Sequence, residues 1–228
     1  MEDDISPSGV KSPGQGGSEG QDTLFYLALG DSYTIGQGAD TQDAFPVQLS
    51  ARLNAVHQDS VFIHSPEIIA KTGWTSSDLL HQAEQADELN RPYDLITLLI
   101  GVNNQYQRLS FSIFERDLED LLHFGIEAAG GDTSRLVLIS VPDYAYTPFG
   151  QNHNDPAQIS SEIEKYNGYL ATQAEAYGIP FIDVTPLSRE GLHNPELLAQ
   201  DGLHPSAEMY AGWVNLMIRD VEKALSLH

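Results

Sequence analysis

Two short segments, far apart in the chain, contain the side chains that an acyl-transfer triad requires. Gly30-Asp31-Ser32-Tyr33 lies near the start of the sequence, and Asp201-Gly202-Leu203-His204-Pro205 lies near its end. A serine hydroxyl becomes a good nucleophile when a histidine takes its proton, and a carboxylate orients that histidine and stabilises its charged form. Ser32, His204 and Asp201 are therefore a candidate nucleophile, general base and orienting acid. The local alternative is that Ser32 and Asp201 only mark the starts of helices.

The elements that must position these side chains follow from the hydropathy pattern. Short apolar runs are typical of parallel strands buried on both faces, and longer segments between them are typical of helices. The runs cover residues 24–29, 61–70 (interrupted at 65–67), 94–100, 136–141 and 179–184, and the helical segments cover residues 44–56, 76–89, 111–129, 157–177 and 206–225. This alternation predicts an α/β fold, a doubly wound, flavodoxin-like five-stranded parallel sheet with helices on both faces.

The carboxyl ends of these strands should bring several unusual loops to one edge of the sheet. Ligands of open parallel sheets bind outside those ends. The loops cover residues 30–32 after the first run, 73–74 after the second, 101–104 after the third and 142–144 after the fourth. The segment that holds Asp201 and His204 precedes the last helix, where a short turn can return an acid and a base to the same edge.

Four separated blocks resemble those of the SGNH branch of the GDSL hydrolases. The blocks are Gly30-Asp31-Ser32-Tyr33, Gly73, Gly101-Val102-Asn103 and Asp201-Gly202-Leu203-His204-Pro205. Each block alone is common, but all four in order, from about residue 24 to the C-terminus, form a specific pattern. The resemblance implies a serine hydrolase in which Ser32, His204 and Asp201 form the triad, with no metal and no cofactor.

The same resemblance implies an oxyanion hole. Its donors would be the backbone N–H groups of Ser32 and Gly73 and the side-chain amide of Asn103, and losing one such donor typically lowers turnover about 10²–10³-fold. From local sequence alone, Gly73 is a turn residue and Asn103 a loop cap. The chain departs from the commonest family wording at Tyr33, where leucine is usual, and at Asn104, where aspartate is usual.

Aromatic residues near these loops are candidates for a substrate pocket. Tyr33, Trp74, Tyr106 and Tyr144 could line it, since ligand sites are mostly apolar, and ordinary loop packing is the alternative. Residues 142–156 are predicted to form an irregular, substrate-selecting flap. At its polar centre, around His153, a solvated loop is favoured over a metal site.

Asp31 and the overall charge carry two further expectations. Asp31 is predicted to make structural hydrogen bonds, because adjacent side chains in a turn diverge and its carboxylate cannot readily reach His204.

The 228 residues include 11 Lys plus Arg and 33 Asp plus Glu, a net charge of −22. Such a surface repels phosphate backbones, so nucleic acid is not an expected partner. The charge serves solubility or, alternatively, adaptation to salt.

The ends of the chain and its composition limit what else can be predicted. Residues 1–22 are expected to form a flexible segment rich in Ser, Gly and Pro, before a hydrolase domain over residues 23–228. The acidic start does not resemble a signal peptide, no apolar run is long enough to span a bilayer, and there is no cysteine. A tether left after removal of an export signal and an artificial leader on a cytoplasmic protein both fit this segment.

Together these features predict a serine esterase that hydrolyses small-molecule carboxylic esters through an acyl-enzyme on Ser32. The resemblance implies small or medium acyl esters, thioesters or lysophospholipids as substrates. The alternatives are a carbohydrate O-acetyl esterase with the same triad, acyl transfer to an alcohol, and a non-catalytic binding domain on the same scaffold. The sequence does not indicate an oligomeric state.

Overall fold

A central parallel sheet forms because its strands are apolar. The computed structural model describes residues 21–86, 92–153 and 155–227. Every residue of β2 (Tyr26–Gly30), β5 (Leu95–Leu99) and β6 (Leu136–Ile139) is buried, as expected for strands covered on both faces. With β4 (Glu67–Ala70) and β7 (Phe181–Ile182) they form a sheet in the order β4-β2-β5-β6-β7, with all neighbours parallel. This is the flavodoxin-like strand order, so the predicted fold class is confirmed.

The predicted strand over residues 61–70 is in fact two strands. β3 (Val61–Ile63) pairs with β1 (Asp22–Leu24) in a separate two-stranded sheet, whereas β4 pairs with β2. Pro66 lies between the two strands and has no backbone N–H to donate to a ladder, which favours a break there. The first predicted run is likewise divided, at Phe25, between the small sheet and the large one.

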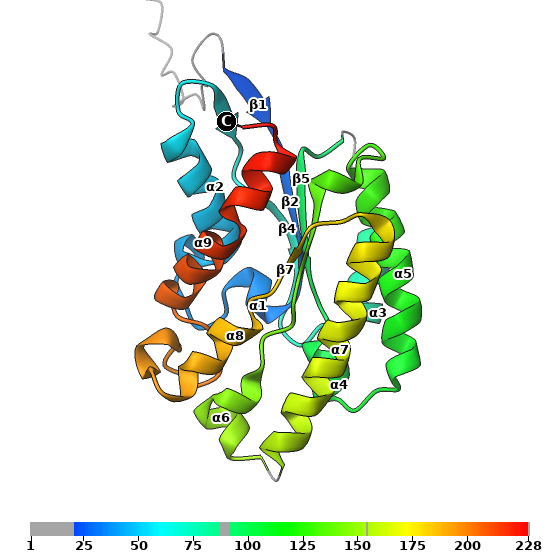
Figure 1. The fold of residues 1–228 in the computed structure, drawn as a ribbon, viewed down its shortest axis with the longest axis vertical. Helices are drawn as coiled ribbons and strands as arrows, with labels where there is room; N and C mark the ends of the chain where they lie inside the picture. The colour runs from blue at the N-terminus through cyan, green and yellow to red at the C-terminus, as the bar shows by residue number, and fades with distance from the viewer. Residues whose placement is uncertain (1–20, 87–91, 154, 228) are drawn as a thin grey trace, which may run out of the picture.

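Helices cover both faces of the large sheet (Figure 1). α2 and α9 pack together on one face, and α3, α5 and α7 lie on the other. The helices are α1 (Ser32–Ile35), α2 (Phe45–Val56), α3 (Ser76–Glu84), α4 (Val102–Tyr106), α5 (Phe111–Ala128), α6 (Pro148–Gln151), α7 (Pro156–Tyr177), α8 (Thr185–Ser188) and α9 (Ala207–Ala224). Short 3-10 turns are η1 (Thr41–Asp43), η2 (Thr133–Arg135), η3 (Tyr144–Tyr146), η4 (Arg189–Leu192) and η5 (Pro195–Leu197).

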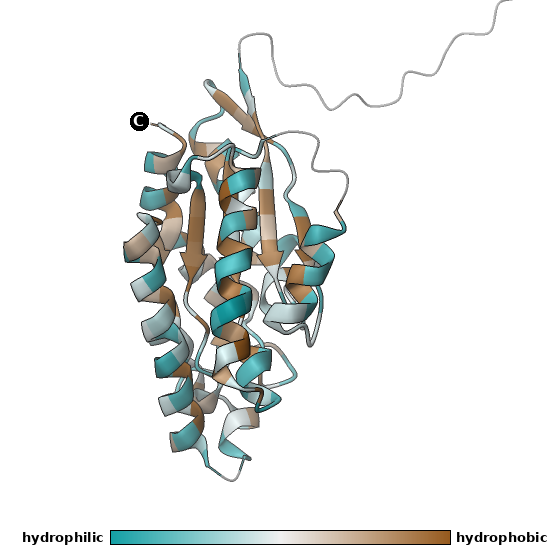
Figure 2. Cartoon of the chain, turned by 90° about the vertical axis from the view of Figure 1, so that its right-hand side faces the viewer, coloured by the Kyte–Doolittle hydropathy of each residue, from teal (hydrophilic) through white to brown (hydrophobic). Residues whose placement is uncertain are grey.

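The long helices agree closely with the predicted ranges, with one exception. The helix predicted over residues 76–89 ends at Glu84, and Leu89 lies outside the described residues. Figure 2 shows apolar strands between helices whose outward faces are hydrophilic, as expected when amphipathic helices cover a buried sheet. Within the described ranges, no helix combines the length and the apolar character that crossing a bilayer requires. The predicted flexible segment lies outside the described residues up to residue 20, and β1 already begins at Asp22.

The carboxyl edge of the sheet is the end at which α1, α4 and α6 lie (Figure 1). β2 ends at Gly30, where a Cβ atom would lie 2.1 Å from Thr34 Oγ1 and 2.5 Å from the carbonyl oxygen of Leu99. Only glycine leaves room for α1 to begin so close to β5. This close approach places Ser32, the first residue of α1, at the carboxyl edge.

Candidate active site

The triad predicted from the sequence is assembled as a chain of hydrogen bonds. His204 Nε2 lies 3.0 Å from Ser32 Oγ, and His204 Nδ1 lies 2.7 Å from Asp201 Oδ2. Ser32 and His204 are each 5% exposed, whereas the carboxylate of Asp201 reaches solvent. With the proton on Nδ1, the free lone pair of Nε2 faces the serine hydroxyl, which is the arrangement that general-base catalysis requires.

A tight turn fixes the acid and the histidine relative to each other. Asp201 Oδ1 accepts hydrogen bonds from the backbone N–H groups of Leu203 at 2.9 Å and His204 at 3.0 Å. Burial raises the pKa of Asp201, but the hydrogen bonds from the His204 side chain and from these two N–H groups outweigh it, so the pKa lies below its ordinary value. Asp201 therefore stays ionised near neutral pH and holds the Nδ1 proton.

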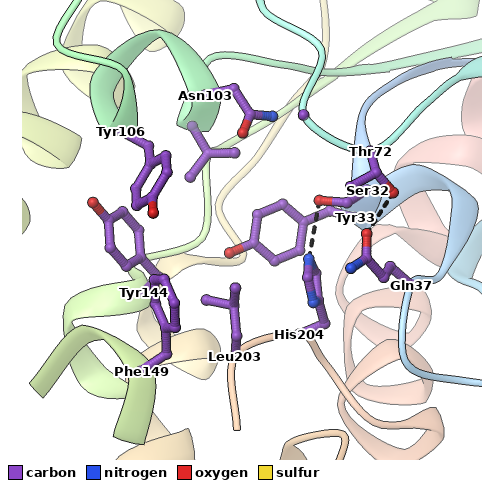
Figure 3. A pocket seen from close by; sticks show the side chains of 12 residues that line it. Ser32, Tyr33, Gln37, Thr72, Asn103, Tyr106, Tyr144, Phe149, Leu203 and His204 are labelled. Carbon is purple, nitrogen blue, oxygen red and sulfur yellow. Dashed lines mark hydrogen bonds between the residues drawn. The ribbon is translucent and has the colours of Figure 1, made fainter. Parts of the chain in front are cut away.

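Ser32 and His204 open onto a cavity of about 260 Å³ (Figure 3). Its lining residues are Ser32, Tyr33, Gln37, Thr72, Gly73, Val102, Asn103, Tyr106, Tyr144, Phe149, Leu203 and His204. The predicted nucleophile, base and oxyanion residues thus meet in one space, although they come from loops far apart in the sequence. Asp201 lies behind His204 and is not part of the lining.

The two remaining oxyanion candidates are held in place through the loop after β4. Gly73 has φ of +81°, a backbone conformation that favours glycine, although a Cβ there would meet nothing within 4 Å. Asn103 Nδ2 donates to the carbonyl oxygen of Trp74 at 2.9 Å, and Gln107 Nε2 donates to that of Gly73 at 3.2 Å. An amide nitrogen carries two hydrogens, so Asn103 retains a second donor for a ligand.

Asn104 connects the same loop to the helix that carries Asn103. Its Oδ1 accepts from the backbone N–H of Ser76 at 2.9 Å, and its Nδ2 donates to Ser76 Oγ at 2.7 Å. Ser76 Oγ in turn donates to Asp117 Oδ2 at 2.8 Å, and all three residues are buried. The aspartate usual at position 104 could not donate to Ser76; in this chain, Asp117 supplies the carboxylate of the buried cluster.

Three of the four predicted pocket residues line the cavity, and one does not. Tyr33, Tyr106 and Tyr144 are part of the lining, and the Tyr33 ring lies 5.5 Å from the His204 ring. Trp74 is not, because its side chain packs against the hydrophobic core while its carbonyl oxygen faces Asn103. Gln37 and Thr72 also line the cavity, although they were not predicted as site residues, and they hydrogen-bond to each other at its rim (Figure 3). Only their closeness to the nucleophile and glycine blocks could have indicated them.

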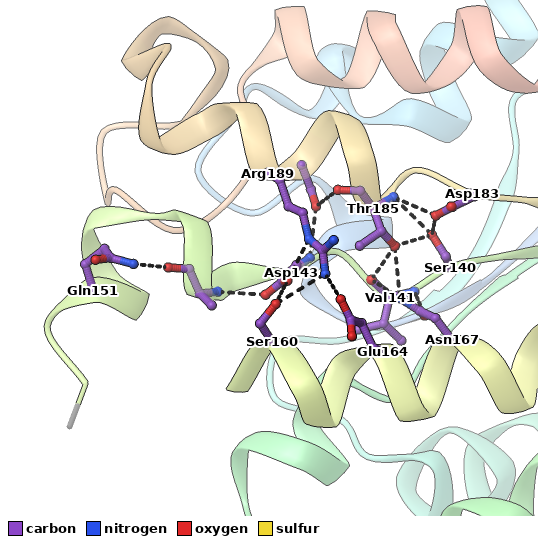
Figure 4. Close-up of polar contacts among 12 residues, drawn as sticks. Ser140, Val141, Asp143, Gln151, Ser160, Glu164, Asn167, Asp183, Thr185 and Arg189 are labelled. Carbon is purple, nitrogen blue, oxygen red and sulfur yellow. Dashed lines mark hydrogen bonds and ion pairs between the residues drawn. The ribbon is translucent and has the colours of Figure 1, made fainter. Parts of the chain in front are cut away.

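Residue 154 of the predicted flap lies outside the described residues, and the part over residues 142–153 is more ordered than predicted, since it contains η3 and α6. Asp143 is buried and caps η3, and its Oδ2 accepts from Arg189 Nε at 2.9 Å and from Ser160 Oγ at 2.6 Å (Figure 4). At the other end, the backbone N–H of Phe149 donates to the carbonyl oxygen of Gly202 at 3.1 Å. These bonds tie the wall that carries Tyr144 and Phe149 to α7, to η4 and to the acid–histidine turn.

Asp31 makes the structural hydrogen bond expected of it, and its second oxygen is left unpaired. Oδ1 accepts from the backbone N–H of Tyr33 at 3.0 Å and caps α1, whereas buried Oδ2 has no partner among the described residues. Burial raises the pKa of Asp31 to about 7, opposed only in part by the Tyr33 hydrogen bond. Because the unfolded chain releases this proton near pH 4, stability should fall as the pH rises from about 4 to 7.

We therefore expect Asp31→Asn to raise the melting temperature of the protein by several degrees more at pH 8 than at pH 5. Asparagine keeps the capping oxygen and resembles the protonated acid, but it cannot ionise. Asp120→Asn, on the exposed side of α5, is the matched control and should follow the wild-type pH dependence. Parallel melting curves for Asp31→Asn and wild type across this range would contradict the assignment of a buried, titrating carboxyl.

The residues that the structure describes contain no cluster of three or more His, Asp or Glu side chains arranged to hold a metal ion. His153, at the centre of the predicted flap, contacts aromatic rings instead: its ring lies 5.0 Å from that of Phe149 and 5.8 Å from that of Tyr106.

Comparisons with known proteins agree with this fold. The structure resembles the lipase/acylhydrolase from Enterococcus faecalis, with 20% identity, 89% of this chain and 96% of that chain covered, and a TM-score of 0.67. It also resembles the psychrotrophic esterase EstA from Pseudoalteromonas sp. (17% identity, 90% and 100% covered, TM-score 0.65). A variant of an acetyl xylan esterase from Geobacillus stearothermophilus is similar as well (18% identity, 88% and 95% covered, TM-score 0.60). At these identities the likeness concerns the fold.

The family assignment comes from the sequence. A search of curated proteins found no significant match. The family model described as the GDSL-like lipase/acylhydrolase family matches residues 28–211, which include all four blocks of the candidate site. The chain therefore belongs to the GDSL-like lipase/acylhydrolase family and is an ester-hydrolysing enzyme.

Proposed function

We propose that the protein is a serine esterase in which Ser32 forms an acyl-enzyme. The single observation that carries this proposal is the hydrogen-bonded chain from Asp201 through His204 to Ser32 at the wall of the cavity. Ser32 Oγ attacks the ester carbonyl while its proton passes to His204 Nε2. The imidazolium then protonates the leaving oxygen as the ester C–O bond breaks. A water molecule, deprotonated by the same nitrogen, releases the carboxylic acid and restores the Ser32 hydroxyl.

The negative oxygen of the tetrahedral intermediate would be held by the N–H groups of Ser32 and Gly73 and by the second N–H of Asn103. Gly73 and Asn103 line the same cavity as Ser32, and their carbonyl and amide contacts keep their loop in place. Donors fixed before the reaction are effective because they need not reorganise as charge develops.

The cavity favours a short acyl group. Its volume of about 260 Å³ lies below the usual range of about 300–1,000 Å³ for pockets that hold drug-sized ligands. Tyr144, Phe149 and Leu203 bound it on the side away from Asn103 (Figure 3). The segment that carries Tyr144 and Phe149 would thus select substrates as a braced wall. Acetyl to butyryl esters fit this space better than long-chain thioesters or lysophospholipids.

Phosphonate labelling and a series of acyl chain lengths test this function together. A fluorophosphonate probe should modify the protein once, and peptide mass spectrometry should place the adduct on Ser32. A phosphonate is a suitable probe because the esterase relative EstA was solved inhibited by monoethylphosphonate. Values of kcat/KM for p-nitrophenyl esters should be highest for acetate or butyrate and at least about tenfold lower for octanoate. A tenfold loss corresponds to roughly 1.4 kcal/mol less transition-state binding of an acyl chain that does not fit the cavity.

A non-catalytic binding domain on the same scaffold predicts the opposite outcome. It would show no labelling at Ser32 and no ester turnover. Labelling at Ser32 with a preference for palmitate would retain the triad but contradict the short acyl pocket.

A further inference from the structure

Beyond the catalytic cavity, the surface continues into a groove between α4 and α7. Two cavities, each of about 360 Å³, share Gln105, Arg108, Gln158 and Glu162, so we treat them as one space and call it the polar groove. Its volume exceeds that of the catalytic cavity, and nothing in the proposed acyl transfer at Ser32 uses it. A substrate whose ester lies at Ser32 has room to extend into it.

Tyr106 and Tyr144 join the two spaces, because both line the catalytic cavity and the polar groove. Tyr106 is 47% exposed, which is unusual for a large aromatic ring, and it stands edge-on to Tyr144 with ring centroids 6.2 Å apart. An exposed aromatic ring beside a ligand cavity provides a flat apolar platform. The C–H face of a pyranose ring is one of the few polar ligands that such a platform suits.

The floor of the polar groove is an ordered chain of planar polar groups. Burial raises the pKa of Tyr144 to about 12, so its hydroxyl keeps its proton and donates to Gln105 Oε1 at 2.8 Å. Gln105 Nε2 donates to Glu162 Oε2 at 2.8 Å, and Gln158 Nε2 donates to Glu162 Oε1 at 2.7 Å. Each amide nitrogen has a further hydrogen and each oxygen a further lone pair, so this floor can both donate to and accept from a ligand's hydroxyl groups.

The charges along the polar groove favour a neutral ligand. Two basic side chains, Arg108 and Lys165, and two acidic ones, Asp155 and Glu162, line it, in a chain that has 33 acidic and only 11 basic residues. An anionic headgroup would meet the carboxylates, and an alkyl chain would leave these polar groups without partners. A polyhydroxylated neutral ligand can pair with all of them.

Arg108 is the most distinctive residue of the polar groove. Its φ of +56° is uncommon for a residue other than glycine, and its guanidinium makes no hydrogen bond or ion pair to any described residue. Backbone strain at a non-glycine residue beside a ligand cavity is a reason to look for function. An arginine held there without a carboxylate partner keeps all its donors available for a ligand.

We propose that the polar groove binds the saccharide part of a neutral, acylated oligosaccharide whose ester lies at Ser32. This inference rests on the proposed esterase function and specifies its alcohol: the sugar hydroxyl is the leaving group that takes the proton from His204. Tyr106 would stack on a sugar ring, and Arg108, Gln158 and Glu162 would pair with its hydroxyl groups.

The test compares long and short substrates in a groove variant. The double variant Arg108→Gly with Gln158→Ala removes two ligand contacts, and glycine also relieves the positive φ at position 108. The substrates are partially O-acetylated xylotetraose, cellotetraose and mannotetraose, with p-nitrophenyl acetate as the short reference. For the best oligosaccharide, the ratio of its kcat/KM to that of the reference should fall at least about tenfold, because one hydrogen bond to a charged group is worth about 1.5–3 kcal/mol.

The matched control is Arg52→Ala, which removes an exposed arginine from α2 on the opposite face of the sheet and should leave that ratio unchanged. The proposal is overturned if the double variant keeps the wild-type ratio. It is also overturned if none of the three acetylated oligosaccharides has a lower KM than the reference, whose activated leaving group makes a comparison of kcat uninformative. Lysophosphatidylcholine is assayed as a fourth long substrate, and a loss of kcat/KM confined to it would overturn the proposal and assign the groove to a headgroup.

Binding without turnover separates failure of this inference from failure of the esterase proposal. Isothermal titration of non-acetylated tetrasaccharides into Ser32→Ala protein needs no catalysis. Heat of binding that disappears when Arg108→Gly and Gln158→Ala are added supports the polar groove even if wild type hydrolyses no ester. Absence of binding by all three sugars overturns the saccharide assignment even if Ser32 proves to be the nucleophile.

Discussion

Replacement of Ser32 by alanine is expected to lower kcat for p-nitrophenyl acetate by at least about 10⁴-fold. The variant lacks the oxygen that lies 3.0 Å from His204 Nε2, so no acyl-enzyme can form. Residual turnover would come from water attacking an ester still held by the oxyanion donors. Steady-state kinetics with a single protein preparation, checked for contaminating esterase by phosphonate labelling, measures the loss.

Ser50→Ala is the matched control for this substitution. Ser50 is as little exposed as Ser32, at 5%, but its hydroxyl donates to the carbonyl oxygen of Val47 within α2, away from the cavity. Both variants lose one buried oxygen, so their thermal stabilities should change by similar small amounts, while only Ser32→Ala loses turnover. A Ser32→Ala protein with kcat within about tenfold of wild type would remove Ser32 from the nucleophile role.

The parts of the site that the sequence predicts are those carried by local motifs. Ser32, Gly73 and Asn103 each follow an apolar strand, and parallel strands deliver their carboxyl ends to one edge whatever the details of packing. Asp201 and His204 are three residues apart, so the turn between them is a local property. The order of the strands in the sheet also follows from the flavodoxin-like pattern, because short crossovers and right-handed connections leave few ways to arrange five such strands.

The parts that it could not predict depend on contacts between distant residues. Trp74 is an aromatic residue of the kind that often lines ligand pockets, yet its ring packs on the hydrophobic core. The direction of a loop side chain follows from tertiary packing and not from the residue type. The polar groove depends on Gln105 meeting Glu162, 57 positions further along the chain. Periodicity indicates that one face of α7 is exposed, but not that it faces α4 across a cavity.

The order of residues 142–153 is another feature that the sequence does not predict. The segment's Pro, Asn and Asp content is typical of an irregular loop, and its local signals, the caps that Asp143 and Thr147 provide, account only for short turns. The segment is fixed to the rest of the fold by distant partners, among them Arg189, more than 40 positions from Asp143, whose guanidinium pairs with that buried carboxylate at 2.9 Å. A buried carboxylate without such a partner would be strongly destabilising. The wall of the catalytic cavity therefore depends on the Arg189–Asp143 ion pair, which no sequence motif predicts.

Asp201→Asn is expected to lower kcat by about 10⁴-fold through the tautomer of His204. Asparagine retains Oδ1 for the backbone N–H groups of Leu203 and His204, so the turn is kept. Its amide nitrogen takes the position of Oδ2, 2.7 Å from His204 Nδ1. As a donor, this nitrogen places the imidazole proton on Nε2, which then presents a hydrogen to Ser32 Oγ and cannot accept the serine proton.

Because Asp201 does not line the cavity, KM for p-nitrophenyl acetate should change far less than kcat, and the rate of fluorophosphonate labelling at Ser32 should fall in parallel with kcat. Asp132→Asn is the matched control, since Asp132 Oδ1 accepts from the backbone N–H of Ser134 at 3.0 Å in a similar turn but contacts no histidine. It should keep wild-type kcat. If Asp201→Asn lost less than about tenfold in kcat while Asp132→Asn behaved as wild type, the carboxylate would not set the His204 tautomer, and the general base would have to act without it.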